Sequence, residues 1–346
     1  MAIEKIKIKC AVSGGVDSAV AAALLKEAGD FEVEGVFMEL WHGPDFQLAK
    51  KRAKGVCQEL GIPFSVLNFQ TEFKEKIVDC FLEELKKGFT PNPCVLCNKK
   101  IKFGLLWEKA GKLSADMVAT GHYARIREKG GILKLTRGKD EEKDQSYFLW
   151  KLNQKQLRRV LFPVGGYTKK EVKKMAKYFG LPAIDSPESQ EICFVKDTTR
   201  DFLKKHLRTK SGKIVDTEGK IIGEHEGLWF YTIGQRKGIE LSGGPYFVVD
   251  KKIKENFLVV TKDRKDLYGK ELMLKDVNWI SGIEPGLPIR VKAKIRYRHS
   301  AAEALLSKHK GEKYLLEFKK PQFAVTPGQS AVFYKRDEVL GGGIIV

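Results

Sequence analysis

The chain has 346 residues, enough for two or three domains, and its hydrophobic content of 42% is sufficient for buried cores. It shows no apolar run long enough to span a bilayer and no signal peptide, so we expect a cytoplasmic protein with no membrane partner. The 63 Lys and Arg against 44 Asp and Glu give a net charge of +19. This excess favours a polyanionic partner such as nucleic acid, although solubility or adaptation to heat would also account for it.

A phosphate-binding loop is predicted near the N-terminus. The apolar run 6–12 is typical of a buried strand, and the alanine-rich run 19–28 is typical of a helix. A turn with two glycines lets the backbone approach an oxyanion, and the helix N-terminus offers free N–H groups. Asp17 could hold Mg²⁺ against the phosphates. The sequence predicts a phosphate cradle made of Ala11, Val12, Ser13, Gly14, Gly15, Val16, Asp17 and Ser18.

Strands and helices alternate after this loop. The expected strands are 31–38, 64–68 and 117–120, and the expected helices are 45–60 and 71–87. Such alternation predicts a parallel sheet with helices on both faces and a ligand at the carboxyl ends of the strands. Met38, at the end of the second strand, could flank an adenine there or belong to the core.

Two cysteines follow a stiff, proline-containing segment. Cys94 and Cys97 are expected where a helix, at about 98–111, begins, and amide dipoles at a helix start lower the pKa of a thiol. The pair is a candidate reactive or metal-binding site. A structural zinc site would need a second Cys or His pair, which the sequence lacks.

Further polar residues follow. His122, after Gly121, is interpreted as a structural residue. Residues 143–149 form a polar cluster before an aromatic run, suited to RNA contact or to a plain loop. Helices are expected at 153–161 and 168–179. Cys193 stands alone, and at this stage a buried structural role and a reactive role are equally open.

The second half of the chain has short apolar segments separated by glycines in place of alternating strands and helices. After a helix at 200–207, short strand-like pieces (213–215, 219–223 and 227–234) predict a small β-rich module. Regular short strands from 246 to 346 predict a β-barrel. Residues 293–299 place three cations beside an aromatic ring, which can hold a phosphate backbone or form a solvated strand face. The expected domains are 1–199, 200–268 and 269–346.

These motifs together resemble the tRNA-specific 2-thiouridylases, over essentially the whole chain. Ser-Gly-Gly-Val-Asp-Ser at 13–18 is shared by all PP-loop ATP pyrophosphatases. More specific are Asn-Pro-x-x-x-Cys-Asn-Lys at 92–99, Ala-Thr-Gly-His-Tyr-Ala at 119–124, Gln-Glu-Ile-Cys-Phe at 190–194 and Tyr-Thr-Ile-Gly-Gln-Arg-Lys-Gly at 231–238. Lys-Asp-Gln-Ser-Tyr-Phe-Leu at 143–149 also matches.

The resemblance implies an α/β PP-loop domain (adenine nucleotide alpha hydrolase-like), a β-rich central domain and a C-terminal β-barrel. It implies ATP-dependent replacement of the 2-oxygen of a wobble uridine by sulfur, with tRNA and a sulfur donor (a cysteine desulfurase, a sulfur carrier or inorganic sulfide) as partners. Cys97 matches the nucleophile and Cys193 the persulfide-bearing cysteine. The implied ATP site is residues 11–18, Met38 and Gly121, and the implied tRNA contacts are Asn92, Pro93, Cys94, Lys143, Asp144, Gln145, Arg296 and Tyr297.

One position departs from the family pattern. Many members carry Asp, a plausible general base, where this chain has Cys94. Three thiolates from Cys94, Cys97 and Cys193 can hold a 4Fe–4S cluster and leave one iron open. We therefore expect ATP, Mg²⁺ and such a cluster as cofactors. The alternatives are a Cys193 persulfide with Cys97 as nucleophile and no cluster, and a non-catalytic, zinc-containing RNA-binding protein.

Overall fold

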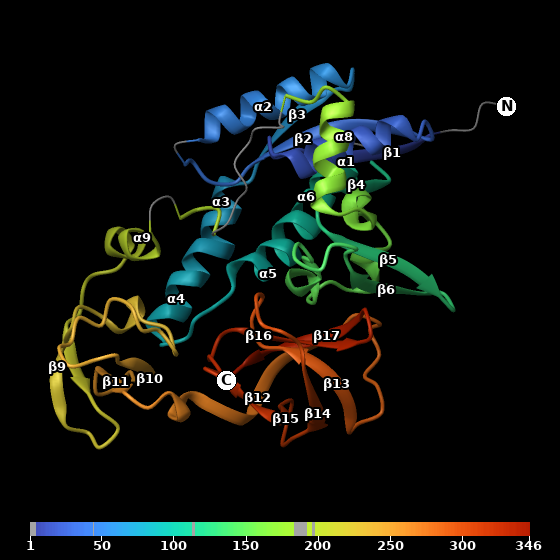
Figure 1. Ribbon diagram of the computed structural model, residues 1–346. Coiled ribbons are helices and arrows are strands. Elements are labelled where there is room, and N and C mark those ends of the chain that lie inside the picture. Colours follow the sequence, from blue (N-terminus) through green and yellow to red (C-terminus); the bar gives the residue numbers. More distant parts are fainter. Residues whose placement is uncertain (1–4, 44, 113–114, 183–191, 196–197) are drawn as a thin grey trace.

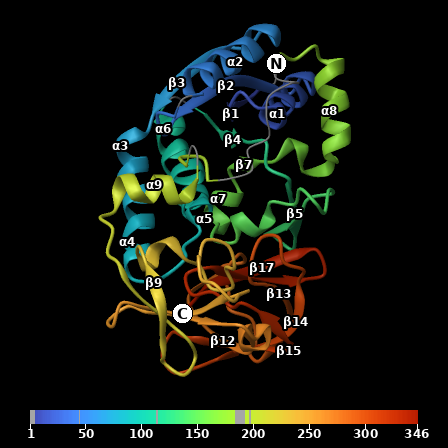
Figure 2. The same cartoon turned by 60° about the vertical axis from the view of Figure 1, so that its left-hand side comes forward.

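A computed structural model describes residues 5–43, 45–112, 115–182, 192–195 and 198–346. The chain forms an N-terminal α/β body, a small β-rich central body and a C-terminal barrel, with the two β-rich bodies side by side below the first (Figure 1; Figure 2). The predicted fold class is confirmed. None of the described helices is both long and apolar enough to cross a membrane.

The N-terminal body is built on a parallel sheet with strand order β3-β2-β1-β4-β7. The phosphate loop follows β1, and the glycine at 121 follows β4, so neighbouring strands bring both to one edge. The strands are β1 Ile6–Ala11, β2 Phe31–Glu39, β3 Phe64–Asn68, β4 Met117–Ala119 and β7 Val160–Leu161.

Helices pack against the parallel sheet and form two hydrophobic cores with it. One core is shared by α1 Val16–Glu27, α2 Phe46–Glu59 and α8 Lys169–Tyr178. The other holds two longer helices, each of which contains a π-helical segment. The first runs through α3 Gln70–Phe73, η1 Lys74–Asp79 and α4 Cys80–Lys86, and the second through α5 Pro93–Cys97, η2 Asn98–Leu105 and α6 Leu106–Lys112.

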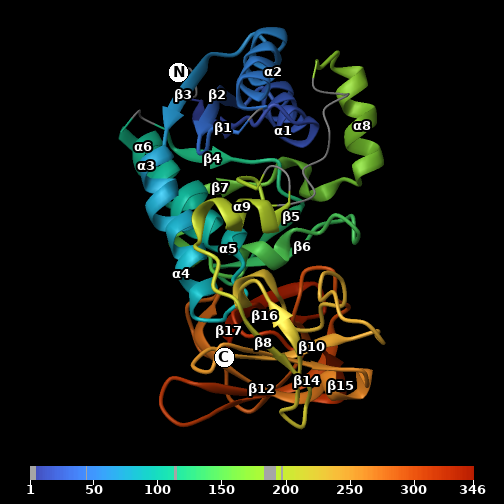
Figure 3. The ribbon, with the colours of Figure 1, turned by 90° about the vertical axis from the view of Figure 1, so that its left-hand side faces the viewer.

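The sequence did not predict an antiparallel hairpin that follows β4. Strands β5 Ala124–Lys129 and β6 Ile132–Arg137 lie between the parallel sheet and the barrel (Figure 3). Thr136 of β6 pairs with Glu338 of β17, so the hairpin extends the sheet of the barrel and remains separate from the parallel sheet. The helix expected at 153–161 is also shorter, because its last residues form β7. The short helices here are η3 Ser146–Leu149, α7 Gln154–Leu157 and η4 Pro163–Gly166.

The central body has a four-stranded sheet with order β10-β11-β8-β9. The expected strand at 227–234 is wrong. This segment forms the 3-10 helix η5 Leu228–Phe230 and a turn, in which Leu228 and Tyr231 are buried. Its apolar residues fill the core of this body without joining a strand ladder. The elements are α9 Thr199–His206, β8 Gly212–Val215, β9 Ile221–His225, β10 Phe247–Lys252 and β11 Phe257–Thr261.

The C-terminal body is a closed antiparallel barrel. Its strands follow the order β12-β15-β14-β13-β16-β17, and pairing of β17 with β12 closes it around a core of its own. Closure leaves no free sheet edge within the barrel. The elements are η6 Arg264–Leu267, β12 Tyr268–Trp279, β13 Ile289–Lys294, β14 Ala302–Lys308, β15 Tyr314–Phe323, β16 Ser330–Lys335 and β17 Glu338–Ile345.

The barrel holds the segment that precedes the Cys94 helix. The Thr90 N–H donates to Pro327 O at 2.8 Å, and the Gln329 Nε2 donates to Thr90 O at 2.6 Å. Gly328 has a φ of +90°, and a Cβ there would lie 2.7 Å from Thr90 N. The barrel therefore fixes the backbone close to where α5 begins.

Candidate active site

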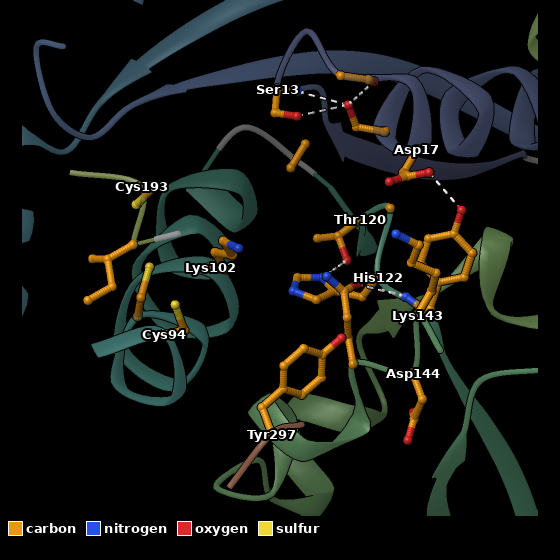
Figure 4. A pocket seen from close by; sticks show the side chains of 18 of the residues that line it. Ser13, Asp17, Cys94, Lys102, Thr120, His122, Lys143, Asp144, Cys193 and Tyr297 are labelled. Carbon is orange, nitrogen blue, oxygen red and sulfur yellow. Dashed lines mark hydrogen bonds between the residues drawn. The ribbon is translucent and has the colours of Figure 1, made fainter. Parts of the chain in front are cut away.

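A cavity of about 1100 Å³ lies between the edge of the parallel sheet and the barrel. Figure 4 shows the phosphate loop on one side, the cysteines on another and Tyr297 on a third. Three predicted site residues, Gly14, Asn92 and Arg296, are not among its lining residues. Those that line it are Ala11, Val12, Ser13, Gly15, Val16, Asp17, Ser18, Met38, Pro93, Cys94, Cys97, Gly121, Lys143, Asp144, Gln145, Cys193 and Tyr297.

The phosphate loop is held in shape by its own serines. The Ser13 N–H donates to Ser18 Oγ at 3.1 Å, and Ser18 Oγ donates to Gly15 O at 2.9 Å. Gly14 has a φ of +80°, and a Cβ there would lie 2.4 Å from the carbonyl oxygen of Ala49. Gly14 thus permits close packing of the loop against α2, while the N-terminus of α1 opens towards the cavity.

Asp17 lies in a charged cluster that sequence reasoning missed. Lys169 Nζ lies 2.7 Å from Asp17 Oδ1 and 2.8 Å from Oδ2, and the Tyr123 hydroxyl donates to Oδ1 at 2.7 Å. Lys169 is buried at the start of α8, whose N-cap is Thr168. One carboxylate beside a phosphate cradle fits Mg²⁺, which binds proteins through one or two carboxylates plus substrate phosphates.

Gly121 packs directly against the start of α1. A Cβ at this position would lie 2.6 Å from Ser18 N and 2.7 Å from the carbonyl carbon of Asp17. Contacts this short would displace the phosphate loop. Gly121 is therefore required for the close approach of β4 and α1, as well as for lining the cavity.

The three predicted cysteines line one cavity. Asn92 caps α5 by accepting the Cys94 N–H at 3.1 Å, which places Cys94 on the first turn and Cys97 about one turn later. Cys97 is buried, Cys94 is half-buried and Cys193 has exposed surface. All six cysteines are free thiols. No three donor side chains of the described residues are arranged to hold a metal ion in this conformation.

The expectation that the helix start lowers the thiol pKa values is wrong. Burial raises the pKa of Cys97 to about 12 and also raises the pKa of Cys94. Cys193 is exposed as a residue, but the surrounding cavity wall removes water from its thiol and raises the pKa to about 11. Nearby Lys102 opposes the rise at all three cysteines. Loss of hydration exceeds the dipole effect here, so the thiols are protonated at neutral pH.

Phe194 anchors the segment that carries Cys193. Its ring is buried among four aromatic rings, with centroid distances from 5.2 to 6.3 Å. Edge and tilted contacts of this kind add to the free energy of apolar burial. Phe194 therefore fixes the adjacent cysteine at the cavity wall. The four rings belong to Trp41, Phe73, Phe81 and Phe202.

His122 is buried on the cavity wall. Its Nδ1 lies 2.7 Å from Thr120 Oγ1, and its ring is 5.8 Å from the Phe103 ring and 5.9 Å from that of Phe162. Burial, with a smaller contribution from Lys102, lowers the pKa of His122 well below its usual value. The imidazole is neutral near pH 7. Since the unfolded chain binds this proton more readily, acidification weakens the folded state here.

The predicted RNA-contact residues have different structural roles. Asp144 is buried and accepts the N–H groups of Gly138 and Ser146, and Gln145 accepts the Tyr123 N–H. Tyr297 stacks obliquely on Phe148, with centroids 4.5 Å apart. The sequence singled out Lys294 and Arg298, but not Lys292 and Arg336, which contribute to this basic wall.

Arg296 does not line the cavity, and its side chain contacts the loop at 324–326 and the central body instead. Its guanidinium donates to Thr326 Oγ1 at 2.6 Å and to the carbonyl oxygens of Ala324 and Ile233. It thereby ties the barrel loop to the central body. That same loop continues into the Pro327–Gln329 contact with Thr90.

The parallel sheet, the Ser-Gly-Gly loop and the nucleotide-sized cavity define a PP-loop ATP-binding protein with a cysteine site. Family models match three parts of the chain: a tRNA methyl transferase HUP domain at 6–197, a tRNA methyl transferase PRC-barrel domain at 200–262 and an aminomethyltransferase β-barrel domain at 269–345. The chain belongs to the family of tRNA-specific 2-thiouridylases.

Curated relatives support this assignment along the full chain. A protein of Clostridioides difficile named tRNA-specific 2-thiouridylase MnmA is 45% identical, covering 98% of each chain. One of the same name from Carboxydothermus hydrogenoformans is 43% identical, covering 99% of this chain and 98% of its own. Among solved structures, the U34-tRNA thiolase NcsA of Methanococcus maripaludis with its [4Fe-4S] cluster matches 59% of this chain and 68% of that chain at 20% identity, with a TM-score of 0.38.

Proposed function

We propose that the protein replaces the 2-oxygen of a wobble uridine in tRNA by sulfur, at the expense of ATP. The observation that carries this proposal is that the phosphate loop and all three candidate cysteines line one cavity. The names of the relatives support the same reaction. It requires tRNA, ATP and a sulfur donor, which would be a cysteine desulfurase, a sulfur carrier or inorganic sulfide, and it fits a cytoplasmic location.

The first step activates the base. ATP lies in the cradle of residues 11–18, with Met38 and Gly121 beside the nucleotide, and Asp17 holds Mg²⁺ at the phosphates. The uridine 2-oxygen attacks the α-phosphorus, an O–P bond forms, and the bond to pyrophosphate breaks. The base is extruded from its stack, because its 2-carbonyl is otherwise out of reach. Asn92, Pro93 and Cys94 then lie beside the target base.

The second step delivers sulfur. A sulfur nucleophile from the Cys94, Cys97 and Cys193 site attacks the activated carbon, and the C–O bond breaks with release of AMP. Three thiols on one cavity wall fit a 4Fe–4S cluster, because thiolate sulfur is the usual ligand of its irons. The three cysteines would hold the cluster, which would supply an iron that binds the sulfur to be transferred. The alternative uses a Cys193 persulfide with Cys97 as nucleophile.

RNA binding is assigned to the basic wall and the two β-rich bodies. We propose Lys143 and Tyr297 as direct contacts at the cavity. Asp144 and Gln145, which bind the backbone of this region, and Arg296, in the neighbouring loop, would hold these contacts in place. The domain boundaries 1–199, 200–268 and 269–346 separate the ATP-dependent chemistry from these RNA-binding bodies.

The reaction is tested by incubating the full chain, under anaerobic conditions, with unmodified tRNA, ATP, Mg²⁺ and sulfide. We expect nucleoside analysis by mass spectrometry to show uridine with one oxygen replaced by sulfur, formed only when ATP is present. A methylated base would assign the reaction to the methyl transfer named in the family description. No ATP consumption, with one zinc per chain, would instead support a non-catalytic RNA-binding protein.

The cluster is tested separately by anaerobic purification. We expect iron and acid-labile sulfide in the purified chain, visible absorbance, and loss of all three in Cys94→Ser. The matched control is Cys80→Ser, because Cys80 lies on α4 and does not line the cavity. An iron-free, colourless protein that thiolates tRNA from a persulfide donor would contradict the cluster and support the persulfide.

A further inference from the structure

Lys102 is a half-buried lysine on the cavity wall. No described residue forms a hydrogen bond or an ion pair with its ammonium group. By contrast, Lys169 at the same cavity is paired with Asp17. Holding an ammonium group in partial burial without a counter-ion costs free energy. A cation kept in this state at a ligand cavity indicates that a bound anion completes its coordination.

The π-helical segment η2 directs Lys102 towards the cysteines. Lys102 follows Cys97 by five residues, and in an α-helix two such residues point about 140° apart. In π-helical geometry, hydrogen bonds join residues five apart, so side chains at this spacing lie on nearly the same side. The Leu106 N–H accordingly bonds to Ile101 O. A regular α-helix would turn Lys102 away from the wall that carries Cys97.

A glutamine from another helix stabilises this local geometry. Gln156 Nε2 donates to Lys99 O at 3.0 Å and to Phe103 O at 2.9 Å, both carbonyls of η2. Gly104 permits the close approach of the Lys99 carbonyl, since a Cβ there would lie 3.0 Å from Lys99 O. The capping box of Asn153 and Gln156 holds the glutamine in place. The orientation of Lys102 is thus supported from outside its own helix.

Lys102 lies between the sulfur site and the nucleotide side of the cavity. Figure 4 shows it projecting between the labelled cysteines and His122. Its charge acts on the thiols of Cys94, Cys97 and Cys193 and on the imidazole of His122, so it is near both groups. Because the pKa of His122 is lowered, that ring stays neutral and supplies no charge of its own.

We propose that Lys102 is a further catalytic residue, whose ammonium group binds the phosphate of the adenylated base and of the departing AMP. This inference rests on the proposed thiolation. When sulfur forms its bond to the activated carbon, the C–O bond breaks and its electron pair passes to a phosphate oxygen of AMP. Lys102 neutralises the charge that develops on this phosphate. A fixed donor at developing charge contributes about 10²-fold or more to the rate of such a step.

The test compares Lys102→Met with Lys102→Arg and with a matched control, Lys100→Met. Lys100 lies on the same π-helical segment but is exposed, and its replacement removes the same charge. Two quantities are measured in single turnovers, pyrophosphate released and thiolated tRNA formed. A third is the Kd for AMP, measured by calorimetry on the protein without tRNA.

For Lys102→Met, we expect pyrophosphate release within a few-fold of the unmodified chain, thiolated tRNA formed about 10²-fold more slowly, and AMP bound at least about tenfold more weakly. Lys102→Arg should restore AMP binding, and Lys100→Met should change nothing. An equal loss of both half-reactions, or unchanged AMP affinity, would overturn the proposal. If the unmodified chain makes no thiolated tRNA, the proposed function fails, while AMP binding still tests Lys102.

Discussion

Replacing Cys97 by serine is expected to abolish thiolation while the chain still activates its substrate. Cys97 is buried at the end of α5 and lines the cavity, whereas the phosphate loop lies on a different wall. A serine hydroxyl cannot carry or present sulfur, so we expect thiolated tRNA to fall by roughly 10³-fold or more. Pyrophosphate release that depends on tRNA should continue. Both products are measured in the same reaction, by nucleoside mass spectrometry and a pyrophosphate assay.

The retained half-reaction is the internal control for folding. A Cys97→Ser chain that releases pyrophosphate is folded, binds tRNA and binds ATP, so its defect lies in sulfur delivery. Cys80→Ser is the matched cysteine control and should behave like the unmodified chain. Thiolation that survives in Cys97→Ser would remove Cys97 from the chemistry in both the cluster and the persulfide versions. It would favour a PP-loop enzyme that needs no cysteine.

Replacing Asp17 by asparagine should have the opposite effect, stopping the first step. The variant loses the carboxylate proposed to hold Mg²⁺, so we expect pyrophosphate release to fall on the order of 10²-fold or more. It also removes the Asp17 carboxylate from the Lys169 ammonium, which is 11% exposed. We expect a loss of roughly 1–3 kcal/mol in the free energy of unfolding, less than for a fully buried pair because Asp17 is 32% exposed.

The double variant Asp17→Asn with Lys169→Met separates these two effects. Removing both charges should recover much of the lost stability, measured as the midpoint of thermal unfolding, because neither charge of the Asp17–Lys169 pair remains. Pyrophosphate release should stay low, because the Mg²⁺ ligand is still missing. If activity returned together with stability, Asp17 would serve only to balance Lys169, and its assignment as a Mg²⁺ ligand would be wrong.

Much of the N-terminal fold could be predicted because its signals are local. The apolar strands and the glycine-punctuated helices agree with the structure to within one or two residues at β2, β3 and α2. The errors fall where distant parts of the chain override a local pattern. The hairpin of β5 and β6 is completed by pairing with β17, and the residues at 227–234 fill a core instead of joining a sheet.

Some residues of the candidate site could likewise be predicted from the sequence, and others could not. The phosphate loop and the three cysteines could be identified from residue type and spacing alone. Tyr123 and Lys169 could not, because they reach Asp17 from positions 106 and 152 residues further along the chain. Lys102 is one lysine among several in its segment, and no pattern in the sequence marks a π-helical turn. The direction of the thiol pKa shifts could not be predicted either, because it depends on burial, and position at a helix N-terminus does not reveal how buried a thiol is.

The sequence by itself determined the chemistry available to this protein: a loop that binds phosphate, three thiols that can handle sulfur and a basic second half suited to RNA. These properties follow from the groups that each residue carries. Only the tertiary structure decided that loop and thiols share one cavity, that Asp17 is paired with Lys169, and that Lys102 lies between them with no hydrogen bond or ion pair to any described residue. These features depend on packing between segments far apart in the chain, because burial and distance set how strongly charged groups interact.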